Sequence, residues 1–441
     1  MNGERVGTWT RLRSGSDRLS YDHRWMASEH GRPLSLSLPF TASGEVRGRH
    51  VGDYFDNLLP DDDTLRARIR RRFALPDADA MTLLRAIGRD CVGALQLLPP
   101  AAAPDATNVL SCEPLDDDGV ARLLAAATND DPARGEEHAD EFRISLAGAQ
   151  EKTALLRVGE TWCRPSGATP TTHIVKLPIG LVGGYGPDGP LDFSLSVENE
   201  WLCLKLLEAF GLPTANASIH RFGEHRALVV ERFDRRWTPD GRWIVRLPQE
   251  DFCQATGTSW RDKYERDGGP GIDRCLALLS GSDRADADKT VFCLCQLAFW
   301  LLAAPDGHAK NFSLFIGRGG RYRATPIYDV MSIWPLIGRG EHLETSHRKA
   351  RLAMALKGRN AHRELRGILP RHWKALADAA GVPGLFDAML GLLSTVPSRL
   401  AWVEAQLPHD FPPRLWQVIR DGVSFQAGRF WQLHDEDPVA T

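Results

Sequence analysis

The sequence predicts an α+β fold in which a strand-rich half precedes a helical half. From residue 141 to 250, short apolar runs such as "THIVKLP" and "RALVVERFDRRW" alternate with glycine-rich turns, a pattern typical of strands. From residue 251 onward the pattern is mainly helical, apart from the strand-like segments "FSLFIG" and "YRATPIYDV". With 441 residues, 43% of them apolar and 25% charged, the chain has the composition of a globular protein of about two to three domains.

The first hundred residues are expected to form short strands and turns, followed by helices. The segment "PLSLSLPF" alternates apolar and polar residues, as a half-buried strand does. Residues 62–90 have helical periodicity, with aspartates at positions where they would cap helices. Prolines interrupt "LLPPAAAPDATN", which places a linker near 97–110, and "DDDGVARLLAAA" then predicts a short helix.

The middle of the chain alternates strands with glycine-rich loops. The segment "FRISLAGAQEKTALLRVGETWCRP" predicts a strand, a glycine turn and further strands. The loop "GLVGGYGPDGP" leads into the predicted helix "SLSVENEWLCLKLLEAFGL". The segment near 231–250 lies between the strand-rich and the helical half, and we expect it to form a hinge.

Composition and charge exclude several classes of function. The net charge of −3 gives the whole molecule no attraction for nucleic acid or a membrane surface. The longest apolar stretch, 290–304, is interrupted by Gln296 and is shorter than the ~20 residues of a membrane span. The N-terminus lacks the apolar core of a secretory signal, and the eight cysteines contain no C-x-x-C pair. We therefore expect a cytoplasmic protein with buried free thiols.

The polar segment "APDGHAKNFSLF", which follows the apolar run at 290–304, carries the first indication of chemistry. In it, Asp306 and Asn311 have the spacing Asp-x4-Asn, and Asp329 follows later in "TPIYDV". Phosphoryl transfer from ATP needs a carboxylate that accepts the hydroxyl proton, and an amide and a second carboxylate that hold Mg²⁺. The order and spacing of these three residues fit those roles.

Further parts of the same chemistry precede this segment. Lys176 ends the strand "HIVK", where a cation would meet the ATP phosphates, and the loop "SLAGAQEKT" comes before it. A helix with two glutamates follows, and Glu200 would hold the lysine, although Glu198 is an equally suitable partner. Taken singly, each residue also has an ordinary explanation: Asp306 capping a turn, Lys176 snorkelling from a strand end, or His308 as a structural histidine.

Long stretches of the chain resemble one known family. The segments "SLAGAQEKTALLR", "TPTTHIVKLPIG", "ERFDRRW", "RLPQED", "YERDGGPGI", "DGHAKNFSLFI", "TPIYDV" and "YFDNLLPDD" are similar to those of HipA, the serine/threonine kinase toxins of bacterial toxin–antitoxin modules. The resemblance implies a two-lobed, protein-kinase-like fold with an additional N-terminal subdomain. The expected parts are the N-terminal subdomain at 1–105, the strand-rich lobe with the phosphate loop at 110–250, and the helical lobe with the catalytic loop at 251–441.

The resemblance also implies roles for individual residues. Asp306 would be the catalytic base, Asn311 and Asp329 the Mg²⁺ ligands, and Lys176 the contact to the ATP phosphates. The segment Glu231–Asp234 would meet adenine through its backbone, with Gln249 and His308 as further neighbours of the nucleotide. The complete set of expected nucleotide-binding residues is Ala147, Gly148, Ala149, Gln150, Glu151, Lys152, Lys176, Glu231, Phe233, Asp234, Gln249 and His308.

Regulation and partners are implied in the same way. In the family, a serine before the glycine loop is autophosphorylated and shuts off ATP binding, and Ser145 is the matching residue. The expected partners are a small helix-turn-helix antitoxin of the HipB type, operator DNA held through that antitoxin, and an aminoacyl-tRNA synthetase as protein substrate. The basic run 346–372 is compatible with DNA contact and equally with a solvated basic face.

Two other functions use some of the same residues. A small-molecule phosphotransferase can share the Asp-x4-Asn spacing, but the long HipA-like segments and Ser145 argue against that class. A pseudokinase that only holds antitoxin and DNA would not need Lys176, Asp306, Asn311 and Asp329 together.

Overall fold

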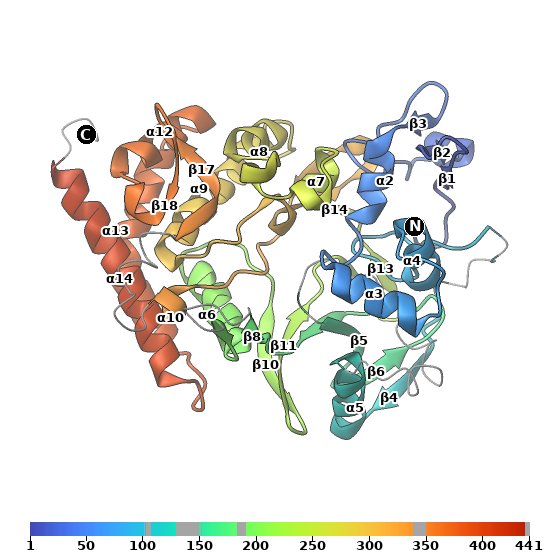
Figure 1. Ribbon diagram of the computed structural model, residues 1–441, viewed down its shortest axis with the longest axis horizontal. Helices are drawn as coiled ribbons and strands as arrows, with labels where there is room; N and C mark the ends of the chain where they lie inside the picture. Colours follow the sequence, from blue (N-terminus) through green and yellow to red (C-terminus); the bar gives the residue numbers. More distant parts are fainter. Residues whose placement is uncertain are drawn as a thin grey trace. The chain divides into compact units, whose positions relative to one another are not determined.

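The chain divides into two units, in each of which segments distant in the sequence lie together (Figure 1). The computed structural model describes residues 1–100, 102, 107–128, 150, 152–182, 191–337 and 350–436. Unit 1 comprises Met1–Leu177, Ser218–Lys263 and Ser313–Thr325. Unit 2 comprises Pro178–Ala217, Tyr264–Phe312 and Pro326–Thr441.

A six-stranded sheet forms the centre of unit 1. Its strands, in spatial order, are β10 (Ala217–Phe222), β11 (His225–Glu231), β7 (His173–Lys176), β5 (Lys152–Val158), β6 (Thr161–Pro165) and β4 (Cys112–Leu115). The predicted short helix is α5 (Asp117–Thr128), which packs beside β4 and β5 (Figure 1). Val120 and Leu124 of this helix share a buried apolar cluster with Leu155 and Val175 of the sheet, which places β5 and β7 over a rigid core.

The N-terminal part of unit 1 has its own apolar core. Its elements are β1 (Gly7–Arg11), β2 (Asp17–Tyr21), α1 (His23–Ala27), β3 (Glu45–Arg47), α2 (Arg49–Asp56), α3 (Asp63–Arg72) and α4 (Ala80–Ile87). The predicted caps are confirmed, because Asp62 accepts a hydrogen bond from Leu65 N and Asp79 accepts one from Met81 N. The helical region 62–90 is therefore two helices, and Pro76 lies in the break between them.

The predicted strand "PLSLSLPF" is wrong. Residues 33–40 form a tight turn closed by an isolated bridge between Ser35 and Leu38. The hydroxyl of Ser35 accepts a hydrogen bond from the backbone N–H of Ser37, and both serine hydroxyls donate to the carbonyl of Gln254. Serine side chains that bind nearby backbone groups compete with strand pairing, so the alternating pattern is overridden locally.

Two smaller sheets complete unit 1. They contain β12 (Arg235–Trp237) paired with β13 (Ile244–Arg246), and β14 (Gln249–Asp251), β15 (Ser313–Ile316) and β16 (Tyr322–Ala324) in that order. The short helix α7 (Phe252–Ala255) begins directly after β14 with a capping box formed by Asp251 and Gln254. The strands expected from "FSLFIG" and "YRATPIYDV" are β15 and β16.

Unit 2 is mainly helical. Its helices are α6 (Ser196–Ala209), α8 (Ile272–Leu279), α9 (Ala285–Leu302), α10 (Trp334–Ile337), α12 (Pro370–Ala380), α13 (Leu385–Glu404) and α14 (Pro413–Glu436). The apolar helix α9 is central, because the ring of its Trp300 lies 5.8 Å from that of Trp373 on α12 and 6.4 Å from that of Phe430 on α14. Helices α13 and α14 pack against each other (Figure 1).

Unit 2 also contains strands that the helical pattern did not predict. Strands β8 (Gly180–Val182) and β9 (Leu191–Phe193) pair, as do β17 (Arg351–Lys357) and β18 (Ala361–Glu364). The second hairpin lies inside the basic run, in a region expected to be helical, and the interior of β17 is apolar and buried. All eight cysteines are free thiols, and all but Cys112 are buried. Among the described residues, no helix is sufficiently long and apolar to span a membrane.

Candidate functional site

The polar loop after α9 begins at a fixed point. Ala303 caps the helix in the left-handed conformation, with φ of 48°, and the N–H of Ala304 donates to the carbonyl of Phe299 at 2.8 Å. Gly307 then passes so close to the Phe299 ring that a Cβ atom there would lie 2.4 Å from it. The lack of a side chain at Gly307 therefore allows Asp306 to follow the helix directly.

The side chain of Asn311 joins the two segments that carry Asp306 and Asp329. The side-chain amide of Asn311 donates to the backbone carbonyl of Asp306 at 2.7 Å and to that of Asp329 at 3.5 Å. Asn311 is buried, whereas the carboxylate of Asp306 is 52% exposed. The Asn311 amide nitrogen thus holds the two aspartate segments, and the Asp306 carboxylate is accessible to an acceptor.

Asp329 has an unusual backbone conformation. Its φ of 60° lies in the left-handed region, which few residues other than glycine adopt and in which aspartate is enriched. The residues on either side are fixed by backbone bonds within unit 2: Ile327 N–H donates to Pro213 O at 2.8 Å and Ile333 N–H donates to Ala303 O at 3.1 Å. A conformation held from both sides at a predicted metal ligand is typical of functional sites.

His308 and Tyr264 lie against Asp306. His308 is only 3% exposed, and its Nε2 lies 3.7 Å from Asp306 Oδ1. The ring of Tyr264 meets the His308 ring edge-on at 4.8 Å, and the Tyr264 hydroxyl donates to Asp306 Oδ1. Sequence reasoning gave Tyr264 no role, although its motif "YERDGGPGI" was one of the recognisable segments.

Lys176 and Lys152 belong to unit 1. Lys176 is buried at the end of β7, and the strand register places it directly opposite Lys152 of β5. Directly opposed residues in an antiparallel pair project to the same face of the sheet, so two cations share this face. The amide of Gln150 donates to the carbonyl of Leu177 at 2.7 Å, which fixes the end of the predicted phosphate loop next to the lysines.

Glu198 and Glu200 are both buried on α6, which belongs to unit 2. Lys176 belongs to unit 1 and the glutamates to unit 2, so the pairing of Lys176 with Glu198 or Glu200 remains a prediction. Between them on the helix, the Asn199 amide exchanges two 2.8 Å hydrogen bonds with the backbone of Ser332, three residues after Asp329. The helix that carries the glutamates is thus attached to the segment that carries the expected metal ligand.

The segment expected to contact adenine lies at the end of β11. Phe233 meets Phe315 edge-on at 5.8 Å, and Gln249 of β14 is the register partner of Phe315. Gln249 is 8% exposed, and among the described residues none donates a hydrogen bond to its buried Oε1. Buried polar atoms are almost always paired, so this oxygen fits a site completed by a bound donor such as an adenine amino group.

A buried ionic network fastens this segment to the N-terminal part of the chain. The carboxylate of Asp90 accepts from Arg232 at 3.1 Å, from Arg235 at 2.8 Å and from Arg246 at 3.0 Å. Arg232 also donates to both carboxylate oxygens of Asp234, and the backbone N–H of Gly93 donates to the same carboxylate at 2.7 Å. The Asp234 side chain is committed to this network, which leaves only its backbone for a nucleotide.

The network also fixes protonation states. Burial alone would raise the pKa of Asp90, but the charges of Arg235, Arg232 and Arg246 outweigh burial and hold the pKa below its ordinary value. Burial would also raise the pKa of Asp234, but the charges of Arg232 and Arg235, together with the hydrogen bonds from Arg232 and Gly93, outweigh burial and lower the pKa. Both aspartates are therefore anions at neutral pH.

Several predicted residues lie outside the described part of the chain. They are Ser145, Ala147, Gly148, Ala149 and Glu151. The start of the basic run 346–372 is also outside it. Within the described remainder, three basic side chains are paired inside unit 2: Arg351 with Glu364 at 2.8 Å, Arg363 with Glu265 at 3.1 Å, and Lys357 with Asp273.

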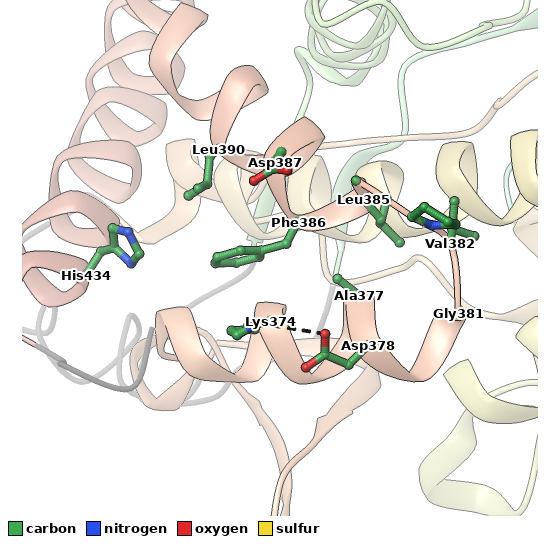
Figure 2. A pocket seen from close by; sticks show the side chains of 12 residues that line it. Lys374, Ala377, Asp378, Gly381, Val382, Leu385, Phe386, Asp387, Leu390 and His434 are labelled. Atoms are coloured by element: carbon green, nitrogen blue, oxygen red, sulfur yellow. Dashed lines mark ion pairs between the residues drawn. The ribbon is translucent and has the colours of Figure 1, made fainter. Parts of the chain in front are cut away.

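A separate cavity of about 660 Å³ lies among α12, α13 and α14. Figure 2 shows Phe386 and His434 on one side of it and the ion pair between Lys374 and Asp378 on the other. None of the residues that line it belongs to the predicted site.

Comparison with protein families gives two matches along the chain. Residues 144–400 match the HipA-like C-terminal domain, and residues 1–98 match the HipA N-terminal domain. The chain belongs to the HipA family. The predicted catalytic loop, the lysine strand and the predicted adenine segment all lie in the C-terminal match, whereas Asp90 lies in the N-terminal match.

Individual relatives agree with this assignment. The "Putative kinase Y4mE" of Sinorhizobium fredii is 34% identical over 335 residues, which cover 75% of this chain and 76% of that protein. The "Serine/threonine-protein kinase toxin HipA" of Shewanella oneidensis is 30% identical over 328 residues, covering 71% and 70%. These relatives confirm the predicted enzyme class, a serine/threonine protein kinase.

A solved structure confirms the fold. It is a complex of HipA, HipB and operator DNA from the Shewanella oneidensis MR-1 toxin–antitoxin system. The match has a TM-score of 0.77 at 25% identity and covers 98% of this chain and 96% of the other. The predicted α+β, kinase-like fold of the HipA family is therefore confirmed.

Proposed function

We propose that this HipA-family chain is an ATP- and Mg²⁺-dependent kinase that acts as the toxin of a toxin–antitoxin pair. The observation that carries the proposal is the loop in which the Asn311 amide binds the backbone of both Asp306 and Asp329. This arrangement holds an accessible carboxylate next to an amide and a second carboxylate, which is the minimal set for phosphoryl transfer to a hydroxyl.

In the proposed mechanism, Asp306 orients the acceptor hydroxyl and takes its proton as the oxygen bonds to the γ-phosphorus and ADP departs. Asn311 and Asp329 supply an amide oxygen and a carboxylate, both hard oxygen ligands suited to Mg²⁺. The Asn311 nitrogen is already bound to backbone acceptors, so its oxygen is the atom left for a cation. Mg²⁺, when bound, would neutralise charge on the phosphates.

Apart from His308, the residues proposed to bind the nucleotide belong to unit 1. The lysine pair Lys152 and Lys176 supplies positive charge on one face of the sheet, and Lys152 is the last residue of the proposed phosphate-binding segment 147–152 in the sequence. The backbone of Glu231–Asp234 and the unpaired oxygen of Gln249 would meet the adenine. In this proposal the chain works as the N-terminal subdomain 1–105, the strand-rich lobe 110–250 and the helical lobe 251–441.

The lysine role gives a direct prediction. Replacing Lys176 by methionine keeps the aliphatic stem but removes the charge, so we expect phosphoryl transfer to fall roughly a hundredfold and ATP to bind more weakly. Nucleotide titration and initial rates measure both effects. The control is Lys205→Met, which removes a lysine that pairs with Glu208 on the surface of α6. If Lys176→Met bound ATP and transferred phosphate as the wild type does, Lys176 would have no role in ATP binding and would be a lysine that snorkels from a strand end.

Partners are proposed from the family. The Shewanella structure is named as a complex of HipA with HipB and operator DNA, and we propose a helix-turn-helix antitoxin of the HipB type for this chain. Operator DNA would be reached through that antitoxin, and an aminoacyl-tRNA synthetase is the proposed protein substrate. The ion pairs of Arg351, Lys357 and Arg363 use part of the charge in the run 346–372, which leaves less of it for DNA phosphates.

One experiment separates the proposed function from its alternatives. The protein is incubated with radiolabelled ATP, Mg²⁺, a cell lysate and a panel of small hydroxyl and amine acceptors. We expect label in protein, in the chain itself and in a lysate protein of the size of a synthetase. Label only in small acceptors would favour a small-molecule phosphotransferase, and no transfer at all would favour a pseudokinase.

Self-inactivation through Ser145 is a further prediction. A phosphate at Ser145 adds roughly −1.5 to −2 charges beside the loop that must fold over ATP. Lys152 and Lys176 would then attract the phosphoserine instead of the ATP phosphates. Wild-type protein incubated with Mg²⁺ and ATP should gain one phosphate at Ser145 and lose ATP affinity.

Intact mass and peptide mapping measure this modification, with Ser166→Ala as the control for an exposed serine on the same unit. Ser145→Ala should fail to gain the phosphate, whereas Ser166→Ala should gain it normally. A phosphate found only elsewhere, or a phosphoprotein that binds ATP as tightly as before, would rule the switch out.

A further inference from the structure

The segment that precedes α8 contacts the proposed catalytic base. The Tyr264 hydroxyl donates to Oδ1 of Asp306, and the Tyr264 ring meets the His308 ring edge-on at 4.8 Å. Tyr264 and Asp306 are 42 residues apart in the sequence, and both belong to unit 2. The tyrosine therefore contacts both ends of the Asp306–His308 turn.

The geometry leaves the second carboxylate oxygen of Asp306 for the reaction. A carboxylate has two oxygens and about four acceptor sites, so a donor on Oδ1 does not prevent Oδ2 from accepting an acceptor hydroxyl. The Asp306 side chain is 52% exposed, and such a side chain otherwise rotates freely. A hydrogen bond from the half-buried Tyr264 would restrict that rotation, and small misplacements of reacting groups are costly in rate.

Tyr264 is itself held through the next residue. Glu265 is only 14% exposed, and its Oε2 accepts a 2.6 Å hydrogen bond from Ala355 N of β17 and lies 3.1 Å from Arg363 NH2 of β18. Gly271 permits this approach, because a Cβ atom there would lie 2.3 Å from Glu265 Oε1. The hairpin β17–β18 thus anchors the segment that carries the tyrosine.

We propose that Tyr264 is a positioning residue for Asp306, and that Glu265 fastens it to the β17–β18 hairpin. This inference rests on the proposed function, since it requires Asp306 to be the catalytic base. The Tyr264 hydroxyl holds Oδ1 of Asp306, so that Oδ2 faces the hydroxyl that accepts the phosphate. The hairpin β17–β18 holds Glu265 and thereby fixes the position of the neighbouring Tyr264. The contact orients the base and takes no part in binding ATP.

The variant Tyr264→Phe removes only the hydroxyl and keeps the ring that packs on His308. The assay uses radiolabelled ATP with the full-length Asp329→Ala chain as acceptor protein, so that transfer by each enzyme variant is measured in trans. We expect kcat to fall roughly tenfold to a hundredfold, with an unchanged KM for ATP and an unchanged melting temperature. A loss of packing alone would lower the melting temperature, and it would not lower kcat selectively at a constant KM for ATP.

Two further variants test the anchor and the specificity of the effect. Glu265→Gln keeps an acceptor for Ala355 N but loses the ion pair with Arg363, so it should lower kcat by a smaller factor, again without changing KM for ATP. Arg266→Gln is the matched control: the Arg266 guanidinium lies over the same tyrosine ring at 5.0 Å and does not contact Asp306. Its rate should remain within about twofold of wild type, because the hydroxyl contact is intact.

The outcomes separate this inference from the proposed function. A wild-type kcat in Tyr264→Phe would overturn the positioning role. A variant in which kcat falls, KM for ATP rises and the melting temperature falls together would overturn it as well. In both cases the kinase assignment would stand. If Tyr264→Phe did not fold, Glu265→Gln would provide the test. An unchanged kcat in Glu265→Gln would then overturn the positioning role of Tyr264. Absence of transfer by the wild-type enzyme would overturn the proposed function, and this inference with it.

Discussion

Replacing Asp306 by alanine is expected to lower phosphoryl transfer by about 10²–10⁴-fold while the fold survives. The side chain is half exposed, so its removal leaves little buried space, although the Tyr264 hydroxyl and His308 lose Asp306 as a partner. Asp329→Ala should abolish transfer as well, because it removes a proposed metal ligand. Initial rates with radiolabelled ATP measure both losses, and circular dichroism verifies that the variants are folded.

The matched control for these variants is Asp378→Ala. Asp378 is an exposed carboxylate of α12, and its weak 3.9 Å pair with Lys374 lies at the separate cavity shown in Figure 2. It belongs to unit 2 like Asp306, and its removal should leave the rate unchanged. A folded Asp306→Ala protein with near-wild-type turnover would show that the loop after α9 is not the catalytic loop.

Removal of Mg²⁺ should distinguish the proposed role of Asp306 from that of Asp329. Chelation of Mg²⁺ is expected to stop transfer by the wild-type enzyme, and added Mg²⁺ should restore it. Asp329→Ala would need a higher Mg²⁺ concentration for whatever activity remains, whereas Asp306→Ala would have an unchanged Mg²⁺ requirement, since Asp306 is proposed to act on the proton and not on the metal.

The sequence could indicate the polar loop after α9 as a candidate catalytic loop because its signals are local. The spacing Asp306-x4-Asn311 directly after an apolar helix constrains both residues to one short loop, and the structure closes that loop with hydrogen bonds from the Asn311 amide. The helix caps at Asp62 and Asp79 were predictable for the same reason, since a cap and the N–H that it binds are two or three residues apart.

Local competition explains the strand that was predicted wrongly. In "PLSLSLPF" the alternation of leucine and serine fits a strand, but Ser35 and Ser37 bind each other and the carbonyl of Gln254. Gln254 follows more than two hundred residues later, so the sequence around the serines contains no sign of this acceptor. The hairpin β17–β18 was missed because its charged residues conceal the apolar interior of β17.

Contacts across long sequence separations carry no sequence signal without related sequences. The Tyr264 hydroxyl reaches a carboxylate 42 residues away, and Asp90 meets Arg232 at a separation of 142 residues. Only the fold shows that Tyr264 and Asp306 are in contact, and that Asp90 and Arg232 are buried together. Both the positioning tyrosine and the ionic network were therefore inaccessible to reasoning from spacing.

The ionic network around Asp90 gives the second large effect. Asp90→Ala is expected to destabilise unit 1 by about 3–5 kcal/mol, because it removes the shared anion of three buried arginines, of which Arg232 and Arg235 keep only Asp234 as an ion-pair partner and Arg246 loses its ion pair. Asp90→Asn keeps the size and one acceptor oxygen, so its loss should be smaller. Urea unfolding followed by tryptophan fluorescence measures the difference, with Asp118→Ala, an exposed aspartate of α5, as the control.

The same substitution should weaken ATP binding, because Arg232 and Asp234 belong to the segment proposed to meet adenine. The network joins residues of the N-terminal and the C-terminal HipA matches. Asp90, from the N-terminal match, would therefore help to position the proposed adenine segment, which lies in the C-terminal match. An Asp90→Asn protein that remains folded and binds ATP as wild type does would confine the network to a role in stability.

The pH dependence of stability provides an independent test of this network. The pKa values of Asp90 and Asp234 are lower in the folded chain than their ordinary value of about 3.9. A carboxylate with a lowered pKa stabilises the folded state fully above its ordinary pKa, and this contribution is lost as the pH falls towards the folded pKa. The stability difference between wild type and Asp90→Ala should therefore be constant near neutral pH and shrink below about pH 4. Urea unfolding midpoints across this range decide the point, and a difference that grows on acidification would show that Asp90 is not held as a buried anion.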